Sequence, residues 1–117
     1  MRVAVTTRKA EGLASPLDPV FGRAAAFLVL DAETRAVVAT MDNPLRDSDQ
    51  GAGTGAAALM NEARVDAVIS GQFGPKAYEA LHRFDIAMWN APDGITAEEA
   101  LDRLLRGELR KMEIKRY

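Results

Sequence analysis

The sequence contains no cysteine and a single histidine, His82. The lack of cysteine excludes disulfides, thiolate-ligated zinc sites, conventional iron–sulfur ligation and thiol nucleophiles. One imidazole and no thiol also leave no Ser-His-Asp or Cys-His arrangement that would activate a nucleophile. The chain therefore lacks the usual side-chain ligands of iron or molybdenum, and we expect a protein without catalytic residues.

The chain also lacks an excess of positive charge, because 15 Lys and Arg residues stand against 17 Asp and Glu residues. Such a balance gives no global field for nonspecific binding of nucleic acid. No apolar run approaches the ~18–20 residues of a membrane-spanning helix. The N-terminus has neither the apolar core nor the cleavage pattern of a signal peptide. We expect a cytoplasmic protein that binds neither nucleic acid nor membrane.

The chain has enough hydrophobic residues, 48% of 117, to form the core of one globular domain. Apolar runs and helical spacing predict the order β-β-β-α-β-α-β-α. The strands are expected at 2–7, 25–30, 35–41, 67–70 and 86–89, and the helices at 53–64, from Pro75, and from Ala97 to a stop at Gly107. We predict a single domain over 1–107, a three-layer α/β/α fold on a five-stranded mixed sheet, and a charged tail over 108–117.

A glycine-rich turn over residues 50–56 stands where a polar loop gives way to the first helix. Glycines let the backbone approach a ligand closely, and a helix N-terminus offers free N–H groups and partial positive charge to an anion. The alternative is a helix start packed tightly on the sheet, where only small residues fit. A P-loop is excluded because no Lys-Ser/Thr pair follows at the required offset, and a dinucleotide fingerprint is unsupported.

Ligands of open α/β sheets bind beyond the carboxyl ends of the parallel strands. Three segments should meet there: the long loop over 8–23, the glycine turn, and the turn over 71–75. Arg23 would neutralise an anionic ligand there, or would pair with Asp18 or tie the loop to the sheet. We expect the Phe21 ring to anchor the loop in the core. The predicted binding residues are Phe21, Gly22, Arg23, Gln50, Gly51, Ala52, Gly53, Gly71 and Gly74.

Other side chains with ligand chemistry are weaker candidates. His82 should lie exposed on the flank of its helix, and Met60 and Met88 should fill the core although a thioether can bind copper(I). Met41 is nearer the predicted site. The acidic residues Asp42, Asp47 and Asp49 share a loop, but their spacing matches no calcium loop. We predict no metal-ligating side chains.

Five segments in order resemble the dinitrogenase iron–molybdenum cofactor biosynthesis family, over roughly residues 1–110. They are residues 1–5, 15–24, 51–53, 71–77 and 94–100. The resemblance implies a ribonuclease H-like fold. It also implies noncatalytic binding of a metal–sulfur cluster or its precursor, containing molybdenum with iron or copper, for carriage or storage. A cluster donor or acceptor protein would then be the partner.

The chain departs from the family pattern at two positions. Many members carry a histidine just before Phe-Gly-Arg and another just before Gly-Ala-Gly, where this chain has Val20 and Gln50. A noncovalent, electrostatic site survives both replacements, and so does a member that has become a ligand-free regulatory or interaction module. Nuclease chemistry, which needs carboxylates on the first strand for two Mg²⁺ ions, is disfavoured because residues 2–7 include no acid.

Overall fold

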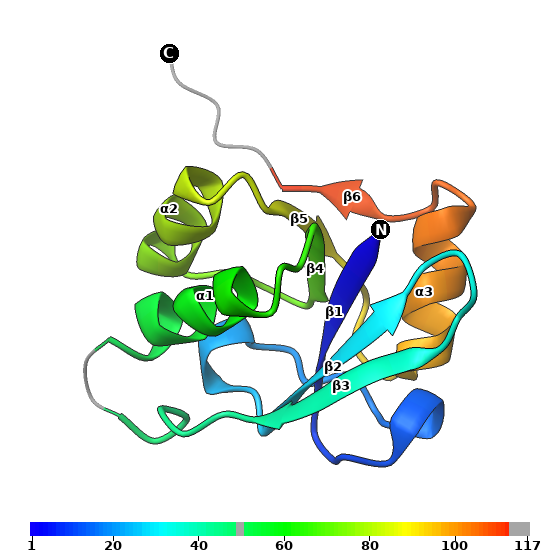
Figure 1. Cartoon of the computed structure of the whole chain (residues 1–117), viewed down its shortest axis with the longest axis horizontal. Helices are drawn as coiled ribbons and strands as arrows, with labels where there is room; N and C mark the ends of the chain where they lie inside the picture. The colour runs from blue at the N-terminus through cyan, green and yellow to red at the C-terminus, as the bar shows by residue number, and fades with distance from the viewer. Residues whose placement is uncertain (49–50, 113–117) are drawn as a thin grey trace.

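The computed structural model describes residues 1–48 and 51–112, in which strands and helices alternate after an initial antiparallel pair (Figure 1). Gln50, Asp49 and residues 113–117 of the predicted tail lie outside the described residues. The strands are β1 (Arg2–Thr7), β2 (Ala26–Asp31), β3 (Val37–Asp42), β4 (Ala67–Ser70), β5 (Ala87–Asn90) and β6 (Arg110–Lys111). The α-helices are α1 (Ala52–Glu62), α2 (Pro75–Arg83) and α3 (Ala97–Leu105), and two 3₁₀ turns are η1 (Gly12–Ala14) and η2 (Phe21–Arg23).

The described strands form one mixed sheet in the order β3-β2-β1-β4-β5-β6. β1, β4 and β5 run parallel, while β2, β3 and β6 pair antiparallel with their neighbours. The prediction of five strands is therefore wrong. The sixth, β6, lies in the predicted tail and has two exposed charged residues, so it carries no apolar pattern and forms through its pairing with β5. The ribonuclease H-like motif stays a prediction.

Helices cover both faces of the sheet, which confirms the predicted three layers (Figure 1). α1 and α2 bury one apolar cluster, which includes Met60, Leu81 and Phe27. α3 buries the other, which includes Leu101 and Ile69. Phe84, which directly follows α2, is 40% exposed because the helix ends before it.

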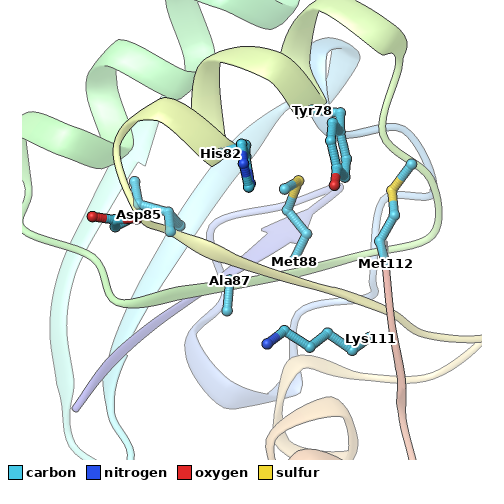
Figure 2. Close-up of a pocket in the computed structure, with 8 residues that line it drawn as sticks. Tyr78, His82, Asp85, Ala87, Met88, Lys111 and Met112 are labelled. Atoms are coloured by element: carbon cyan, nitrogen blue, oxygen red, sulfur yellow. The ribbon is translucent and has the colours of Figure 1, made fainter. Parts of the chain in front are cut away.

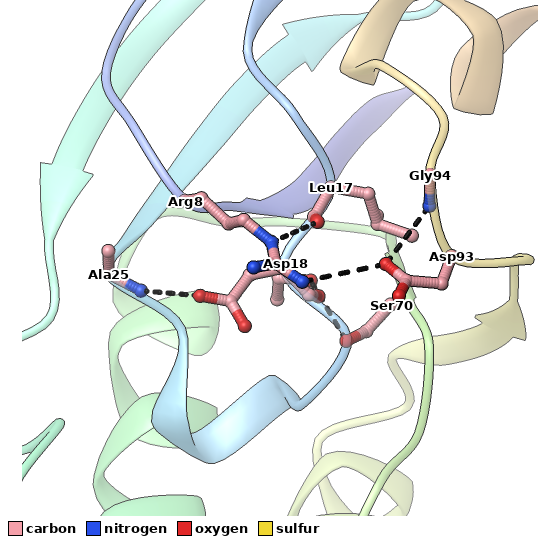
Figure 3. A network of polar contacts seen from close by, with 8 residues as sticks. Arg8, Leu17, Asp18, Ala25, Ser70, Asp93 and Gly94 are labelled. Carbon is pink, nitrogen blue, oxygen red and sulfur yellow. Dashed lines mark hydrogen bonds and ion pairs between the residues drawn. The ribbon is translucent and has the colours of Figure 1, made fainter.

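The long loop over 8–23 is held along the edge of the sheet by polar contacts (Figure 3). The Thr6 hydroxyl donates to the Asp18 carbonyl oxygen at 2.7 Å. The hydroxyl oxygens of Thr6 and Ser70 lie 2.9 Å apart and form a second hydrogen bond. Nearby, Gln72 N donates to the Pro19 carbonyl at 2.8 Å. Hydrogen bonds therefore attach the loop to the C-terminal ends of both β1 and β4.

Across residues 1–48 and 51–112, none of the helices has the length and apolar character needed to cross a lipid bilayer.

The turn between β2 and β3 yields a pH-dependent prediction. Backbone N–H groups of Thr34, and then of Glu33, donate to Asp31 and hold the pKa of its carboxyl below the ordinary value of 3.8. A carboxyl whose pKa is lower in the folded than in the unfolded chain stabilises the fold at any pH above its unfolded-state pKa. This stabilisation is lost as the pH falls through the folded-state pKa. We expect Asp31→Ala to lower the urea midpoint at pH 7 and to leave it unchanged at about pH 2. Asp31→Asn, which keeps an acceptor oxygen, should lose less at pH 7; an equal loss at both pH values would contradict the assignment.

Candidate functional site

A cavity of about 440 Å³ opens where η2 meets the N-terminal ends of α1 and α2. In Figure 1 these two helix ends lie together at the left of the molecule, beside the light-blue η2 turn. Six of the nine predicted binding residues line the cavity, and four further residues line it with them. The lining residues are Val20, Gly22, Arg23, Gly51, Ala52, Gly53, Gly74, Pro75, Lys76 and Ala77.

The two helix starts at the cavity have no side-chain caps. α1 begins after Gly51, which has a φ of 79°, and α2 begins after Gly74. By contrast, the N-terminus of α3 is capped, because Thr96 accepts a hydrogen bond from Glu99 N at 3.2 Å, as the Thr-x-x-Glu pattern indicates. The first N–H groups of an α-helix have no acceptor within the helix. Both uncapped ends therefore direct N–H donors and partial positive charge towards the same space.

Three glycines of the predicted site are explained by close packing. A Cβ on Gly22 would stand 3.0 Å from the backbone of Gly53, and a Cβ on Gly53 would stand 3.0 Å from the Ala77 Cβ. A Cβ on Gly71 would stand 2.5 Å from the Pro19 carbonyl oxygen, and Gly71 does not line the cavity. Tight packing and anion binding are therefore compatible explanations of the glycine turn, because the packing that requires small residues also brings the two helix N-termini to one cavity.

Gly74 has no such explanation. Its φ is −69°, which any residue adopts, and a Cβ there would meet nothing within 4 Å. It also occupies an N-cap position, where Ser, Asp or Asn would stabilise the helix more than glycine does. A side chain at this position would extend into the cavity, so glycine keeps the cavity open at the start of α2.

Arg23 lines the cavity and also holds a neighbouring loop in place. Its Nη1 donates to the carbonyl oxygen of Arg46, at 2.9 Å, and to that of Ser48. The guanidinium thus ties the loop after β3, while Asp18, its alternative partner, accepts from Ala25 N instead. Arg23 is nevertheless exposed and lines the cavity.

Lys76 adds a second positive charge that the sequence reasoning missed. It is exposed, lies in the first turn of α2, and lines the same cavity as Arg23. Its position directly after Gly74-Pro75 was the available signal, because a lysine there stands beside the helix N-terminus. The described lining includes no acidic side chain, so the cavity favours anions.

Phe21 lies beneath the cavity and not in its lining. Its ring is fully buried, with centroids 5.7 Å from that of Phe27 and 5.4 Å from that of Phe73. The structure therefore places Phe21 as the anchor of η2. It can act on a ligand only through the position that it gives Gly22 and Arg23.

The remaining candidates for metal ligation do not gather at the cavity. Within residues 1–48 and 51–112, no group of three His, Cys, Asp or Glu side chains is arranged to hold a metal ion. Asp42 and Asp47 are exposed, and Asp49 lies outside the described residues. Met60 is fully buried in the core cluster under α1 and α2, and Met41 is partly buried and packs against this cluster.

A comparison with models of known families identifies one family. The family model described as dinitrogenase iron-molybdenum cofactor matches residues 1–107. An uncharacterised protein of Methanocaldococcus jannaschii, MJ0580, is 30% identical over 99 residues, which cover 83% of each chain.

Solved structures show the same fold. The apo form of the orange protein from Desulfovibrio gigas is 36% identical, with a TM-score of 0.89, over 95% of this chain and 92% of that chain. A putative NifB protein from Thermotoga is 24% identical, with a TM-score of 0.82, over 98% of this chain and 97% of that chain, and supports the fold alone.

Proposed function

The chain belongs to the dinitrogenase iron-molybdenum cofactor family, and from this premise we propose that it is a small noncatalytic carrier or storage module for an anionic metal–sulfur cluster or its precursor. The metals would be molybdenum with iron or copper. The observation that supports this most is the meeting of two uncapped helix N-termini, Arg23 and Lys76 at one cavity. Backbone donors and cationic side chains in this arrangement bind anions.

The size and lining of the cavity suit a polynuclear guest. Its volume of about 440 Å³ is many times the ~30 Å³ that one water molecule occupies in the liquid. Val20, Ala52, Pro75 and Ala77 give it apolar walls, which accommodate polarizable sulfide better than a strongly hydrated oxyanion. The fit therefore favours a bulky, soft anion.

The guest would be held without direct bonds from the lining side chains to a metal. Val20 stands where many family members have a histidine, and it contributes only an apolar wall. A cluster bound by amides and positive charge keeps its own ligands and dissociates intact. This chemistry fits delivery between a cluster donor and an acceptor protein, which we place in the cytoplasm.

Removing the charge of Lys76 tests the proposal. The protein is mixed with tetrathiomolybdate, with and without copper, and separated from free anion before an absorbance scan. We expect the wild type to retain colour and molybdenum. Lys76→Gln should weaken retention roughly tenfold, since it removes one charge-assisted contact, and added salt should weaken binding further.

Lys9→Gln is the matched control, because Lys9 is exposed and is not a lining residue. Equal retention by Lys9→Gln and wild type is expected. An absence of uptake by the wild type, together with a protein partner that binds equally with and without metal, would instead support the ligand-free interaction module. That alternative rests on the replacement of both histidines by Val20 and Gln50.

A further inference from the structure

A second cavity, of about 260 Å³, lies near the C-terminal end of α2 (Figure 2). It shares no lining residue with the first cavity. Where the first is lined by glycines, cations and helix starts, this one is lined by sulfur and aromatic side chains. The lining residues are Tyr78, His82, Asp85, Ile86, Ala87, Met88, Lys111 and Met112.

The register of the sheet places two methionines side by side in this cavity. β5 and β6 pair Trp89 with Lys111, and the next pair is Met88 with Met112, whose backbone N donates to the Met88 carbonyl at 2.9 Å. Directly opposed residues of antiparallel strands point to the same face, with Cβ atoms roughly 4.5–5.5 Å apart. Met88 is 3% exposed and Met112 packs against the same core cluster, so both thioethers face α2.

A histidine of α2 lines the same cavity as these two methionines. His82 lies one turn after Tyr78, and their rings stack with centroids 5.9 Å apart and planes 9° apart. Stacking on Tyr78 limits the rotation of the imidazole. Figure 2 shows the His82 ring directed towards the Met88 side chain, with Met112 on the far side of the Tyr78 hydroxyl. Three rotatable bonds let a methionine thioether adjust its position.

We propose that this cavity binds copper(I), with the His82 imidazole and the Met88 and Met112 thioethers as ligands. Thioethers are soft donors that select copper(I) over hard divalent ions, and imidazole also suits copper. Lys111 also lines the cavity, but neighbouring residues of an extended chain point to opposite faces, so its ammonium group extends away from the methionines. Figure 2 accordingly shows Lys111 on the other side of β5 from Met88, and Asp85 directed away from the pair.

This second cavity favours a cation, whereas the first cavity favours an anion. The C-terminal end of a helix carries partial negative charge, which favours a cation near the end of α2. The copper site uses side-chain ligands, whereas the first cavity uses backbone amides and positive charge. Loss of one site therefore leaves the other intact, and each can be tested alone.

The test is an anaerobic titration of the metal-free full chain with copper(I), kept reduced by ascorbate and measured by competition with a chromophoric copper(I) chelator. No molybdate or sulfide is present. We expect one copper(I) per chain, and at least tenfold weaker binding in each of Met112→Leu and His82→Gln. Silver(I), a redox-inert substitute, should shift the methyl resonances of Met88 and Met112 and leave that of Met60 in place.

Met41→Leu is the matched control, because Met41 is partly buried and packs on the same core cluster without lining this cavity. It should bind copper(I) as the wild type does. Equal affinity in the wild type and His82→Gln, or zinc(II) binding as tight as copper(I), would overturn the proposal. His82 is exposed, so His82→Gln remains decisive even if a methionine variant fails to fold.

Discussion

Replacing Gly74 by aspartate should abolish uptake of an anionic cluster while leaving the protein as stable as before, or more so. Gly74 has the extended backbone of a helix N-cap and open space in front of it. An aspartate there can accept hydrogen bonds from the first free N–H groups of α2. The helix should gain from a few tenths to about 1 kcal/mol from the cap and the dipole.

The same carboxylate would compete with the guest. It would occupy the N–H donors at the start of α2 and place a negative charge beside Lys76 in the cavity. Losing charge-assisted hydrogen bonds worth about 1.5–3 kcal/mol each predicts a loss of affinity of at least roughly a hundredfold. The measurements are molybdenum retention after tetrathiomolybdate treatment, and urea unfolding of the same sample.

Gly74→Asn separates charge from occupancy, because asparagine has the shape of aspartate and also caps helices without a charge. We expect it to weaken binding less than Gly74→Asp does. Equal loss in the two variants would show that space, and not charge, decides binding. Undiminished uptake by Gly74→Asp would place the anion elsewhere and remove the main support of the carrier proposal.

The largest loss of stability is expected for Phe21→Ala. Its ring is fully buried and contacts Phe27 and Phe73, and truncation of a buried phenylalanine costs about 3–5 kcal/mol. That is a large fraction of the ~5–15 kcal/mol that stabilises a typical domain. The urea midpoint should fall steeply, and uptake of the cluster should fall with it because η2 would lose its anchor.

Phe84→Ala is the control for this prediction, since Phe84 is 40% exposed at the end of α2. It should cost less than about 1 kcal/mol. Phe21→Leu, which refills part of the space, should fall between the two. Similar midpoints for Phe21→Ala and Phe84→Ala would mean that the anchoring role assigned to Phe21 is wrong.

The helices could be predicted from the sequence because their apolar residues recur at helical spacing, and five of the strands could be predicted because each is a short apolar run. On α1, for example, Ala52, Ala56 and Met60 recur at helical intervals and are all buried. β6 could not be predicted in this way. Arg110 and Lys111 are both exposed, so only the free edge of β5, a tertiary feature, makes them a strand.

The meeting of the glycine turn with the loop after β1 could be predicted from the sequence, whereas the contacts of individual side chains around the cavity could not. Strand order brought the glycine turn to Arg23, because both follow strand ends on one side of the sheet. The hydrogen bonds from Arg23 to the loop after β3 depend on how that loop folds back, which no local pattern specifies. Met88 and Met112 are 24 residues apart in sequence, and only the register of β5 and β6 makes them neighbours.

The two uncapped helix starts have a consequence for how such a protein changes over time. Main-chain amides belong to every residue type except proline, so a substitution that neither fills the cavity nor disturbs the close packing of Gly22 and Gly53 leaves the donors in place. They also recognise outline and charge and do not distinguish one metal from another. If the chain carries a cluster as proposed, its binding would tolerate sequence change, and the choice of metal would be left to the protein that supplies the cluster.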